Sequence, residues 1–311
     1  MPSAPNWVRR LATTTYILDM RTIIEFLLQR PSAELFHYTD AEGLIGILGG
    51  REIWATSIRH LNDSREFVHA MYLLQEEARR RAKDESCAAK TIWNDLLDQW
   101  ERKRPEAEEV EVGIASFSTE GNQLSQWRAY APRGNGYSLG FSLDNLRYAR
   151  RKSGKLFLVK CVYEEREKQE LICAVADYFE KSWQQIEKVK GLGGLVHLFR
   201  MMQRAYGVMA AIKDEGFKEE NEWRLVVTTS KEGWKFRKGR FGLLPYCPIP
   251  LCASSAKPSL SSVFIGPHPE PMIAEHSVEL FLKDHITNAP NPNEFFSKKT
   301  IVQTSRIPYR Y

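Results

Sequence analysis

The order of helical and strand-like segments restricts the fold of this chain more than any single motif does. Two long stretches with helical periodicity, about 167–188 and 195–213, stand between two groups of strand-like runs. The strand-like runs are residues 112–117, 137–141, 156–163, 222–229, 242–249 and 262–265. Strands and helices do not alternate regularly. This favours an α+β fold with a mixed or antiparallel central sheet flanked by helices over a doubly wound parallel sheet.

The N-terminal part of the chain has helical and strand patterns of its own. After an amphipathic helix at 16–30, we predict a strand at 34–38, a helix at 40–48, a strand at 52–56 and helices to about 83 and at 92–104. Thr39 and Glu42 have capping-box spacing before the second helix, and Gly49-Gly50 is expected to end it.

These patterns divide the chain into three parts. Residues 1–30 form a helical extension, residues 31–287 form a single α+β domain, and residues 288–311 form an irregular tail. The helical pair, about 167–213, is expected to be an insertion between strands of one sheet, because no Gly, Pro or Ser-rich linker divides the domain.

Composition excludes several classes of protein. The five cysteines lack CxxC spacing, which predicts reduced thiols in a cytoplasmic protein and no structural metal. The sequence has no run of about 18 apolar residues, so no membrane span is predicted. The net charge of +5 permits a phosphate-bearing partner but does not require one. Two basic clusters, 147–155 and 235–240, fit solvated surfaces as well as they fit a phosphate site.

Four polar blocks stand at predicted strand or helix ends and are candidates for chemistry. The first is His37-Tyr38-Thr39, where a histidine could contact a sugar hydroxyl or act as a base, or be a buried core residue. The second is 62–66, where Asp63 and Glu66 have helix-capping spacing and could instead contact a ligand or metal.

The other two blocks lie further along the chain. Trp127 and Tyr130 are three residues apart, so one helical turn would place both on one face, either against a planar base or in the core. In an extended segment, Glu220, Glu222 and Arg224 would share one face, either in a site or on a solvated edge strand.

These blocks, in this order, resemble a bacterial family called domain of unknown function 2971. The resemblance rests on FHYTDAEGLIGIL, EIWATSIRHLNDSREF, SFS with LSQWRAYAPRGNGYSLGF, FKEENEWRLV, and GLLPYCPIPL with VFIGP. Together they span Phe36 to Pro267. The family name implies no activity.

A second resemblance is to the ADP-ribosyltransferase fold, which often opens with a strand ending in His-Tyr-Thr, a short helix and another strand. It implies that His37, with Tyr38 and Thr39 beside it, contacts the ribose of NAD. It further implies that Trp127 or Tyr130 stacks on nicotinamide and that a glutamate on a later strand completes the site. Here Glu222 stands in that order, and Glu220-x-Glu222 resembles the paired glutamates of some toxins in the superfamily.

The resemblance therefore predicts an NAD-using enzyme, in the role of a toxin or an anti-phage effector. Its catalytic residues would be Glu222, Glu220 and His37, and Arg224 or the 235–240 cluster would meet the pyrophosphate. The acceptor would be a protein, a nucleic acid, a small molecule or water. Two alternatives stay open: a metal-dependent nuclease or phosphodiesterase, and a non-catalytic module that binds a nucleotide or a partner. The ligands of the metal site would be His37, Asp63, Glu66 and Glu222.

Overall fold

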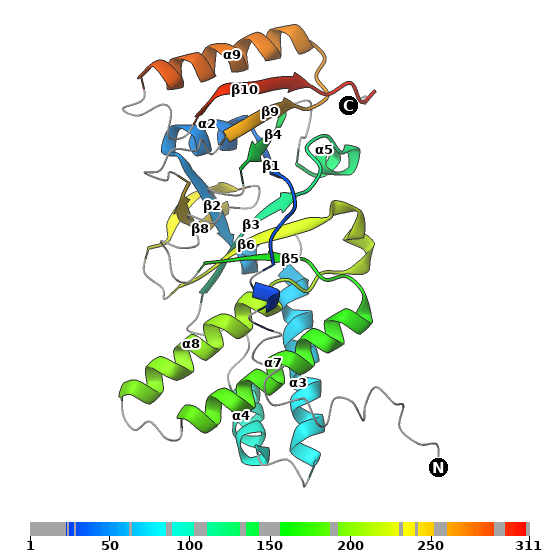
Figure 1. Ribbon diagram of the computed structural model, residues 1–311, viewed down its shortest axis with the longest axis vertical. Coiled ribbons are helices and arrows are strands. Elements are labelled where there is room, and N and C mark those ends of the chain that lie inside the picture. The colour runs from blue at the N-terminus through cyan, green and yellow to red at the C-terminus, as the bar shows by residue number, and fades with distance from the viewer. Residues whose placement is uncertain are drawn as a thin grey trace.

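The computed structural model describes residues 23, 25–27, 29–61, 64–84, 89–102, 111–130, 135–142, 156–186, 192–229, 233–239, 242–251, 260–288 and 296–308. Its strands form one large sheet with helices packed on both sides (Figure 1). In the described ranges, every strand pair is antiparallel except the pair at one edge, formed by the last two strands. The predicted α+β class with a mostly antiparallel sheet flanked by helices is confirmed.

The elements follow one another in the order predicted for most of the chain. They are β1 (Leu35–Asp40), α2 (Ala41–Gly50), β2 (Glu52–Ser57), η1 (Ile58–His60), α3 (Ser64–Lys83), α4 (Lys90–Arg102), β3 (Glu111–Ser118), α5 (Leu124–Tyr130), β4 (Gly136–Phe141), β5 (Leu156–Lys160), α7 (Glu165–Ile186), α8 (Leu192–Met209), η4 (Glu215–Glu220), β6 (Glu222–Thr229), β7 (Lys235–Gly239), β8 (Gly242–Pro250), β9 (Leu260–Ile265), α9 (Pro271–Asn288) and β10 (Phe296–Thr304). The sheet order is β10-β9-β4-β1-β3-β2-β8-β7, and β6 pairs with both β3 and β5.

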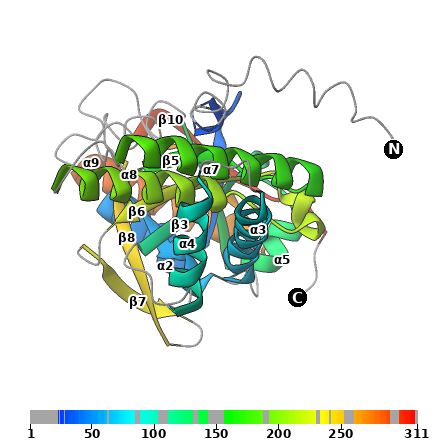
Figure 2. The same cartoon turned by 90° about the horizontal axis from the view of Figure 1, so that it is seen from below.

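A helical lobe lies below the sheet and contains the predicted helical pair. Helices α7 and α8 connect β5 to β6, which are neighbouring strands, and they pack beside α3 and α4 (Figures 1 and 2). The lobe buries Leu74, Trp93, Phe179 and Tyr206 completely or nearly so. None of the helices in the described ranges is long and apolar enough to cross a membrane.

A second apolar core lies on the other face of the sheet, under α2 and α9. It includes Ile47, Phe117, Leu225 and Val263. Alternation along β6 explains the division between the two cores, because successive side chains of a strand point to opposite faces. Trp223 and Leu225 enter this second core, whereas Val226 enters the core of the helical lobe.

The strand β3 creates a split in the sheet. Along one edge, β3 pairs with β6 over its whole length, from Glu111 to Ser118. On the other edge, β1 meets β3 only at Ser118, while β2 meets it at Gly113 and Ile114. The strands β1 and β2 therefore diverge from β3 and leave the middle of its edge, around Ser116, facing an opening instead of a strand.

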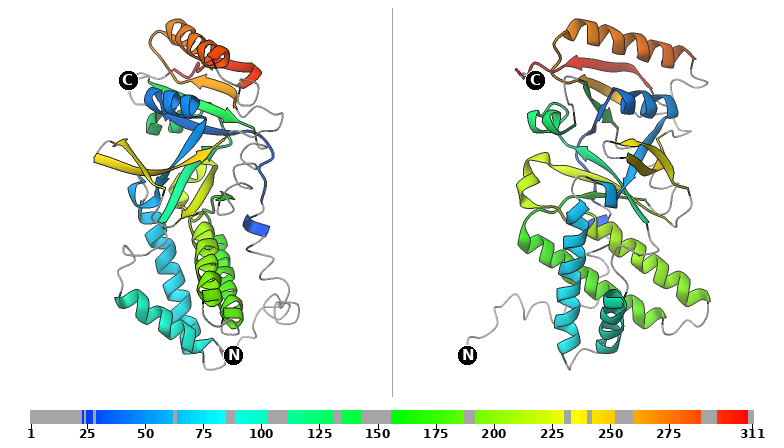
Figure 3. Two further views of the ribbon diagram at one scale, coloured as in Figure 1. Left: turned by 90° about the vertical axis from the view of Figure 1, so that its left-hand side faces the viewer. Right: turned by 180° about the vertical axis from the view of Figure 1, so that it is seen from behind.

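Several local predictions are wrong. The tail is not irregular throughout, since 296–304 form β10, which pairs in parallel with β9 at the edge of the sheet (Figure 3). Asp40, not Thr39, caps α2, and its carboxylate accepts a hydrogen bond from the Gly43 N–H. The helix continues through Gly49 and Gly50, because Arg51 adopts the left-handed conformation that ends it.

The structure describes one of the two basic clusters and only part of the 62–66 block. The residues 235–239 form the strand β7, which pairs with β8 in a hairpin that projects from the body of the molecule (Figures 2 and 3). The cluster at 147–155 and the predicted cap residues Asn62 and Asp63 lie outside the described residues. Helix α3 begins at Ser64 in the described part of the chain.

Candidate functional site

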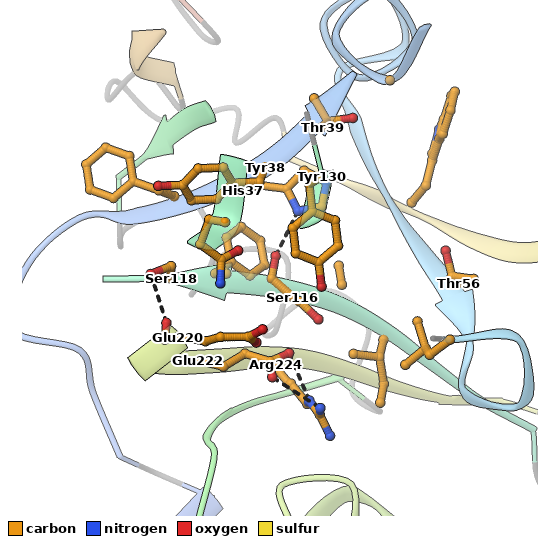
Figure 4. A pocket seen from close by; sticks show the side chains of 18 of the residues that line it. His37, Tyr38, Thr39, Thr56, Ser116, Ser118, Tyr130, Glu220, Glu222 and Arg224 are labelled. Carbon is orange, nitrogen blue, oxygen red and sulfur yellow. Dashed lines mark hydrogen bonds and ion pairs between the residues drawn. The ribbon is translucent and has the colours of Figure 1, made fainter. Parts of the chain in front are cut away.

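A cavity of about 280 Å³ lies at the split between β1 and β2. Figure 4 shows side chains from β1, β2, β3, α5 and β6 converging on it. The residues of the site that line it are His37, Tyr38, Thr39, Thr56, Ser116, Tyr130, Glu220, Glu222, Arg224 and Arg237, together with Lys213. The fold therefore brings three of the four polar blocks of the sequence to one cavity.

His37 forms the β1 side of the cavity and reaches across the split. Its Nδ1 lies 2.8 Å from the carbonyl oxygen of Ser116, in the part of β3 that pairs with neither β1 nor β2. The pKa of His37 is lowered to about 4. Burial is the main cause and the charge of Arg237 adds to it, while the hydrogen bond to Ser116 acts in the opposite direction. The imidazole is therefore neutral at pH 7. Because a carbonyl oxygen only accepts, Nδ1 carries the proton and Nε2 is an acceptor.

Two glutamates form the opposite side of the cavity and share one lysine. The Lys213 ammonium donates to Glu220 Oε2 and to Glu222 Oε2, each at 2.6 Å. Figure 4 shows the two carboxylates side by side below β3, with the Tyr130 ring directed toward them. Glu222 begins β6, as predicted, but Glu220 precedes the strand, in the turn η4.

The two carboxylates differ in exposure. The Glu222 side chain is 4% exposed and that of Glu220 is 13% exposed. Although burial alone would raise it, the pKa of Glu222 is lowered to about 2 by the charges of Arg224 and Lys213 and by their hydrogen bonds. Glu222 is therefore a fixed negative charge at any physiological pH. The alternative of a solvated edge strand is wrong, because β6 lies between β3 and β5.

Arg224 does not occupy the position predicted for a phosphate ligand. Its guanidinium is 3% exposed and donates to both oxygens of Glu222, to Glu66 Oε2 at 2.6 Å and to the carbonyl of Ala210. The predicted contact with a pyrophosphate is wrong, because these protein acceptors already hold the group. Glu66 and Arg224 instead join the ion network behind the cavity.

The two aromatic candidates separate, and only one of them lines the cavity. Trp127 is buried, packs against Tyr38 with ring centroids 4.7 Å apart, and donates from Nε1 to Asn122. It is a core residue, so the prediction that it stacks on a ligand is wrong. Tyr130 is half-buried and lines the cavity, and its stacking on a ligand stays a prediction.

Tyr38 and Thr39 also separate, because successive side chains of β1 alternate. The Tyr38 hydroxyl donates to the Glu120 carbonyl and accepts from the Gln123 N–H, so its polar end fastens the loop before α5. Tyr38 also lines the cavity, so its predicted contact with a cofactor stays a prediction, but not one made through the hydroxyl. Thr39 remains on the wall of the cavity, where Figure 4 shows it beyond His37.

Two cations of the cavity, Lys213 and Arg237, were not among the individual candidate residues predicted from the sequence. Lys213 follows the apolar run 208–212, and a lysine after buried residues is a weak sign of a buried ion pair. Arg237 lines the cavity from β7 and donates from Nη2 to Thr56 Oγ1 at 3.0 Å. Alternation along a basic strand could have indicated that one of its cations points inward.

The predicted metal ligands do not assemble in the described part of the chain. Within those residues, no group of three or more His, Cys, Asp or Glu side chains is placed to hold a metal ion. Asp63, one of the four ligands in that alternative, lies outside the described residues. The Lys213 ammonium occupies the position between Glu220 and Glu222 where a metal ion could bind both carboxylates.

Comparison with known proteins supports one of the two resemblances. Residues 126–225 match the family described as Protein of unknown function (DUF2971), which confirms that resemblance over this part of the chain. The matched region contains most of α5, the first half of β6 and both glutamates of the cavity. No curated protein and no solved structure gives a significant match.

Proposed function

We propose that this protein is an NAD-using, ADP-ribosyltransferase-like enzyme that cleaves the bond between nicotinamide and ribose in the cavity at the sheet split. One observation carries the proposal: His37, Tyr130 and the pair Glu220 and Glu222 line one cavity. They come from β1, from α5, and from the end of η4 and the start of β6, and these three places are far apart in sequence. A histidine, an aromatic ring and a glutamate are the set that the resemblance predicts for NAD.

The charge of the ion network suits this reaction. When the C1′–N bond breaks, its electron pair leaves with nicotinamide and positive charge develops on the ribose ring. Three carboxylates, Glu66, Glu220 and Glu222, face two cations, Lys213 and Arg224, which leaves one net negative charge when all five are ionised. A preorganised negative charge of this kind stabilises a developing oxocarbenium ion.

The burial and contacts of each residue suggest its role. Glu220 is the more exposed carboxylate and would contact the ribose hydroxyls. Glu222 would supply fixed charge and hold Lys213. The neutral His37 would accept a hydrogen bond from the ribose at Nε2, and Tyr130 would lie against nicotinamide. The acceptor, whether water or another nucleophile, then bonds to C1′ and releases its proton.

The cavity volume fits part of a dinucleotide. Ligand pockets commonly enclose about 300–1,000 Å³. A cavity of about 280 Å³ therefore matches the nicotinamide riboside half of NAD, with the remainder extending outward. A toxin or anti-phage role and a cytoplasmic location stay predictions.

The proposal is tested by incubating the protein with NAD and measuring free nicotinamide, once with EDTA and once with Mg²⁺. We expect release in both, because no step uses a metal. Release that requires Mg²⁺, or nuclease activity without NAD cleavage, would favour the metal-dependent alternative. NAD binding without release would favour the binding module, which is compatible with the paired state of both Glu222 oxygens.

A further inference from the structure

Arg237 is a half-buried cation in the cavity wall whose hydrogen-bonding capacity is only partly used. Its Nη2 donates to Thr56 Oγ1 at 3.0 Å, and its guanidinium lies 5.6 Å from the centre of the Trp54 ring. Its Nε is buried and has no hydrogen-bond partner among the described residues. A buried donor without an acceptor costs free energy, so its presence in a cavity wall points to an acceptor that enters from the cavity.

The surroundings of Arg237 differ from those of Arg224, the other arginine of the cavity. Arg224 contacts two carboxylates directly. In the described part of the chain, no carboxylate lies within ion-pair distance of Arg237, although the exposed Asp40 and Glu42 act on it from further away. Burial accordingly lowers the pKa of Arg237, as expected for a cation that lacks a close counter-ion.

The position of Arg237 places positive and negative charge at different ends of one cavity. Its partner Thr56 belongs to β2, and Figure 4 shows Thr56 on the side of the cavity away from Ser118 and Glu220. The carboxylates therefore face one part of a bound molecule and the guanidinium faces another. A molecule that fits this polarity has hydroxyl groups or developing positive charge at one end and a strong anion at the other.

We infer that Arg237 forms a phosphate-binding subsite, which takes the diphosphate of a nucleotide whose ribose faces Glu220. This inference deepens the proposed function and rests on it for the placement of the ribose. The Trp54 ring and Thr56 hold the guanidinium plane, and its unused N–H groups can donate to phosphate oxygens as a fork. The remaining cations of β7 do not line the cavity: Lys235 pairs with Glu52 and Lys238 is exposed.

The test is a calorimetric titration of ADP-ribose and of adenosine into the wild type, Arg237→Gln and the matched control Lys238→Gln. We expect Arg237→Gln to weaken ADP-ribose binding about ten- to a hundredfold, the loss of charge-assisted hydrogen bonds. Adenosine, which has no phosphate, should bind both proteins alike, and Lys238→Gln should match the wild type. Equal ADP-ribose affinity in wild type and Arg237→Gln, or no ADP-ribose binding by the wild type, would overturn the inference.

Two further measurements keep the result interpretable. If Arg237→Gln fails to fold, Arg237→Lys takes its place: it keeps the charge but lacks the fork, so binding should weaken several-fold, and unchanged binding would count against the inference. Nicotinamide release separates this inference from the proposed function. Phosphate-dependent binding at Arg237 without NAD cleavage would refute only the enzyme proposal, whereas cleavage with an unaltered KM in Arg237→Gln would refute only the subsite.

Discussion

Two ion networks in this molecule have the same number of charges but different surroundings. In the helical lobe, Arg80 and Arg81 face Glu77, Asp177 and Glu180, with Arg81 in contact with all three carboxylates at 2.6–3.0 Å. Behind the cavity, Lys213 and Arg224 face Glu66, Glu220 and Glu222. Each network thus combines two cations with three carboxylates.

Burial and position distinguish the two networks, and charge count does not. In the lobe, the two cations Arg80 and Arg81 are 65% and 12% exposed, and the network joins α3 to α7. At the cavity, Lys213 and Arg224 are 1% and 3% exposed. A desolvated cluster beside a cavity is costly without a purpose, whereas a half-solvated one between two helices is explained by packing. For this reason we propose a function for the network behind the cavity and not for the network in the lobe.

The largest effect is expected for Glu222→Gln. The change removes the carboxylate that Lys213 and Arg224 share and leaves these two buried cations with one carboxylate each, so the free energy of unfolding should fall by about 3–5 kcal/mol. Urea denaturation of the purified variant measures the loss. A decrease below about 1 kcal/mol would mean that this network behaves like a solvent-exposed ion pair, which would remove the contrast with the lobe.

A smaller effect is expected for Arg81→Gln in the lobe. Glu77 stays buried and keeps Arg80, so the free energy of unfolding should fall by about 1–3 kcal/mol. The matched control Arg79→Gln, at an exposed position on the same helix, should change it by less than about 1 kcal/mol. Nicotinamide release by the folded Arg81→Gln protein should equal that of the wild type. A selective loss of release would assign function to both networks.

The smallest effect concerns pH and separates the cavity from the lobe again. The pKa of His37 is about 4 in the folded protein and 6.5 in the unfolded chain. The unfolded state therefore takes up a proton first, and stability falls as the pH decreases from 6.5 to 4. Thermal denaturation at pH 7 and pH 5 should show a decrease on the order of 1 kcal/mol in the wild type that is reduced in His37→Asn. Identical decreases in both proteins would show that the pKa of His37 is not lowered.

The fold was predictable where local pattern and burial agree. The strands from β1 to β6 and the long helices follow hydrophobic periodicity, and the register of β6 follows from the alternation of Trp223 and Leu225 with Glu222 and Arg224. The strand β7 was missed because its charged residues resemble a solvated turn. β10 was missed because a polar segment gained its partner from β9, a contact that only the tertiary structure supplies.

The candidate site was predictable as a set of residues but not as a set of contacts. The order of His37, Tyr130 and the two glutamates was visible in the sequence. The burial of Trp127 was not visible in the sequence, because two aromatic residues three positions apart have the same spacing whether they lie in a core or in a cleft. Lys213 and Arg237 depend on the split in the sheet, which arises because β1 and β2 share one edge of β3. Strand pairing between segments so far apart in the chain leaves no local pattern in the sequence.

Single-turnover release of nicotinamide by Glu220→Gln, compared with Glu219→Gln, tests the central claim most directly. Glu219 is the exposed neighbour of Glu220, so its variant makes the same chemical change outside the cavity. Lys213 keeps Glu222 as a partner in Glu220→Gln, so the fold should persist. We predict a loss of about a hundredfold in rate for Glu220→Gln and wild-type release for Glu219→Gln. Equal rates for the two variants, or no release by the wild type, would contradict the account.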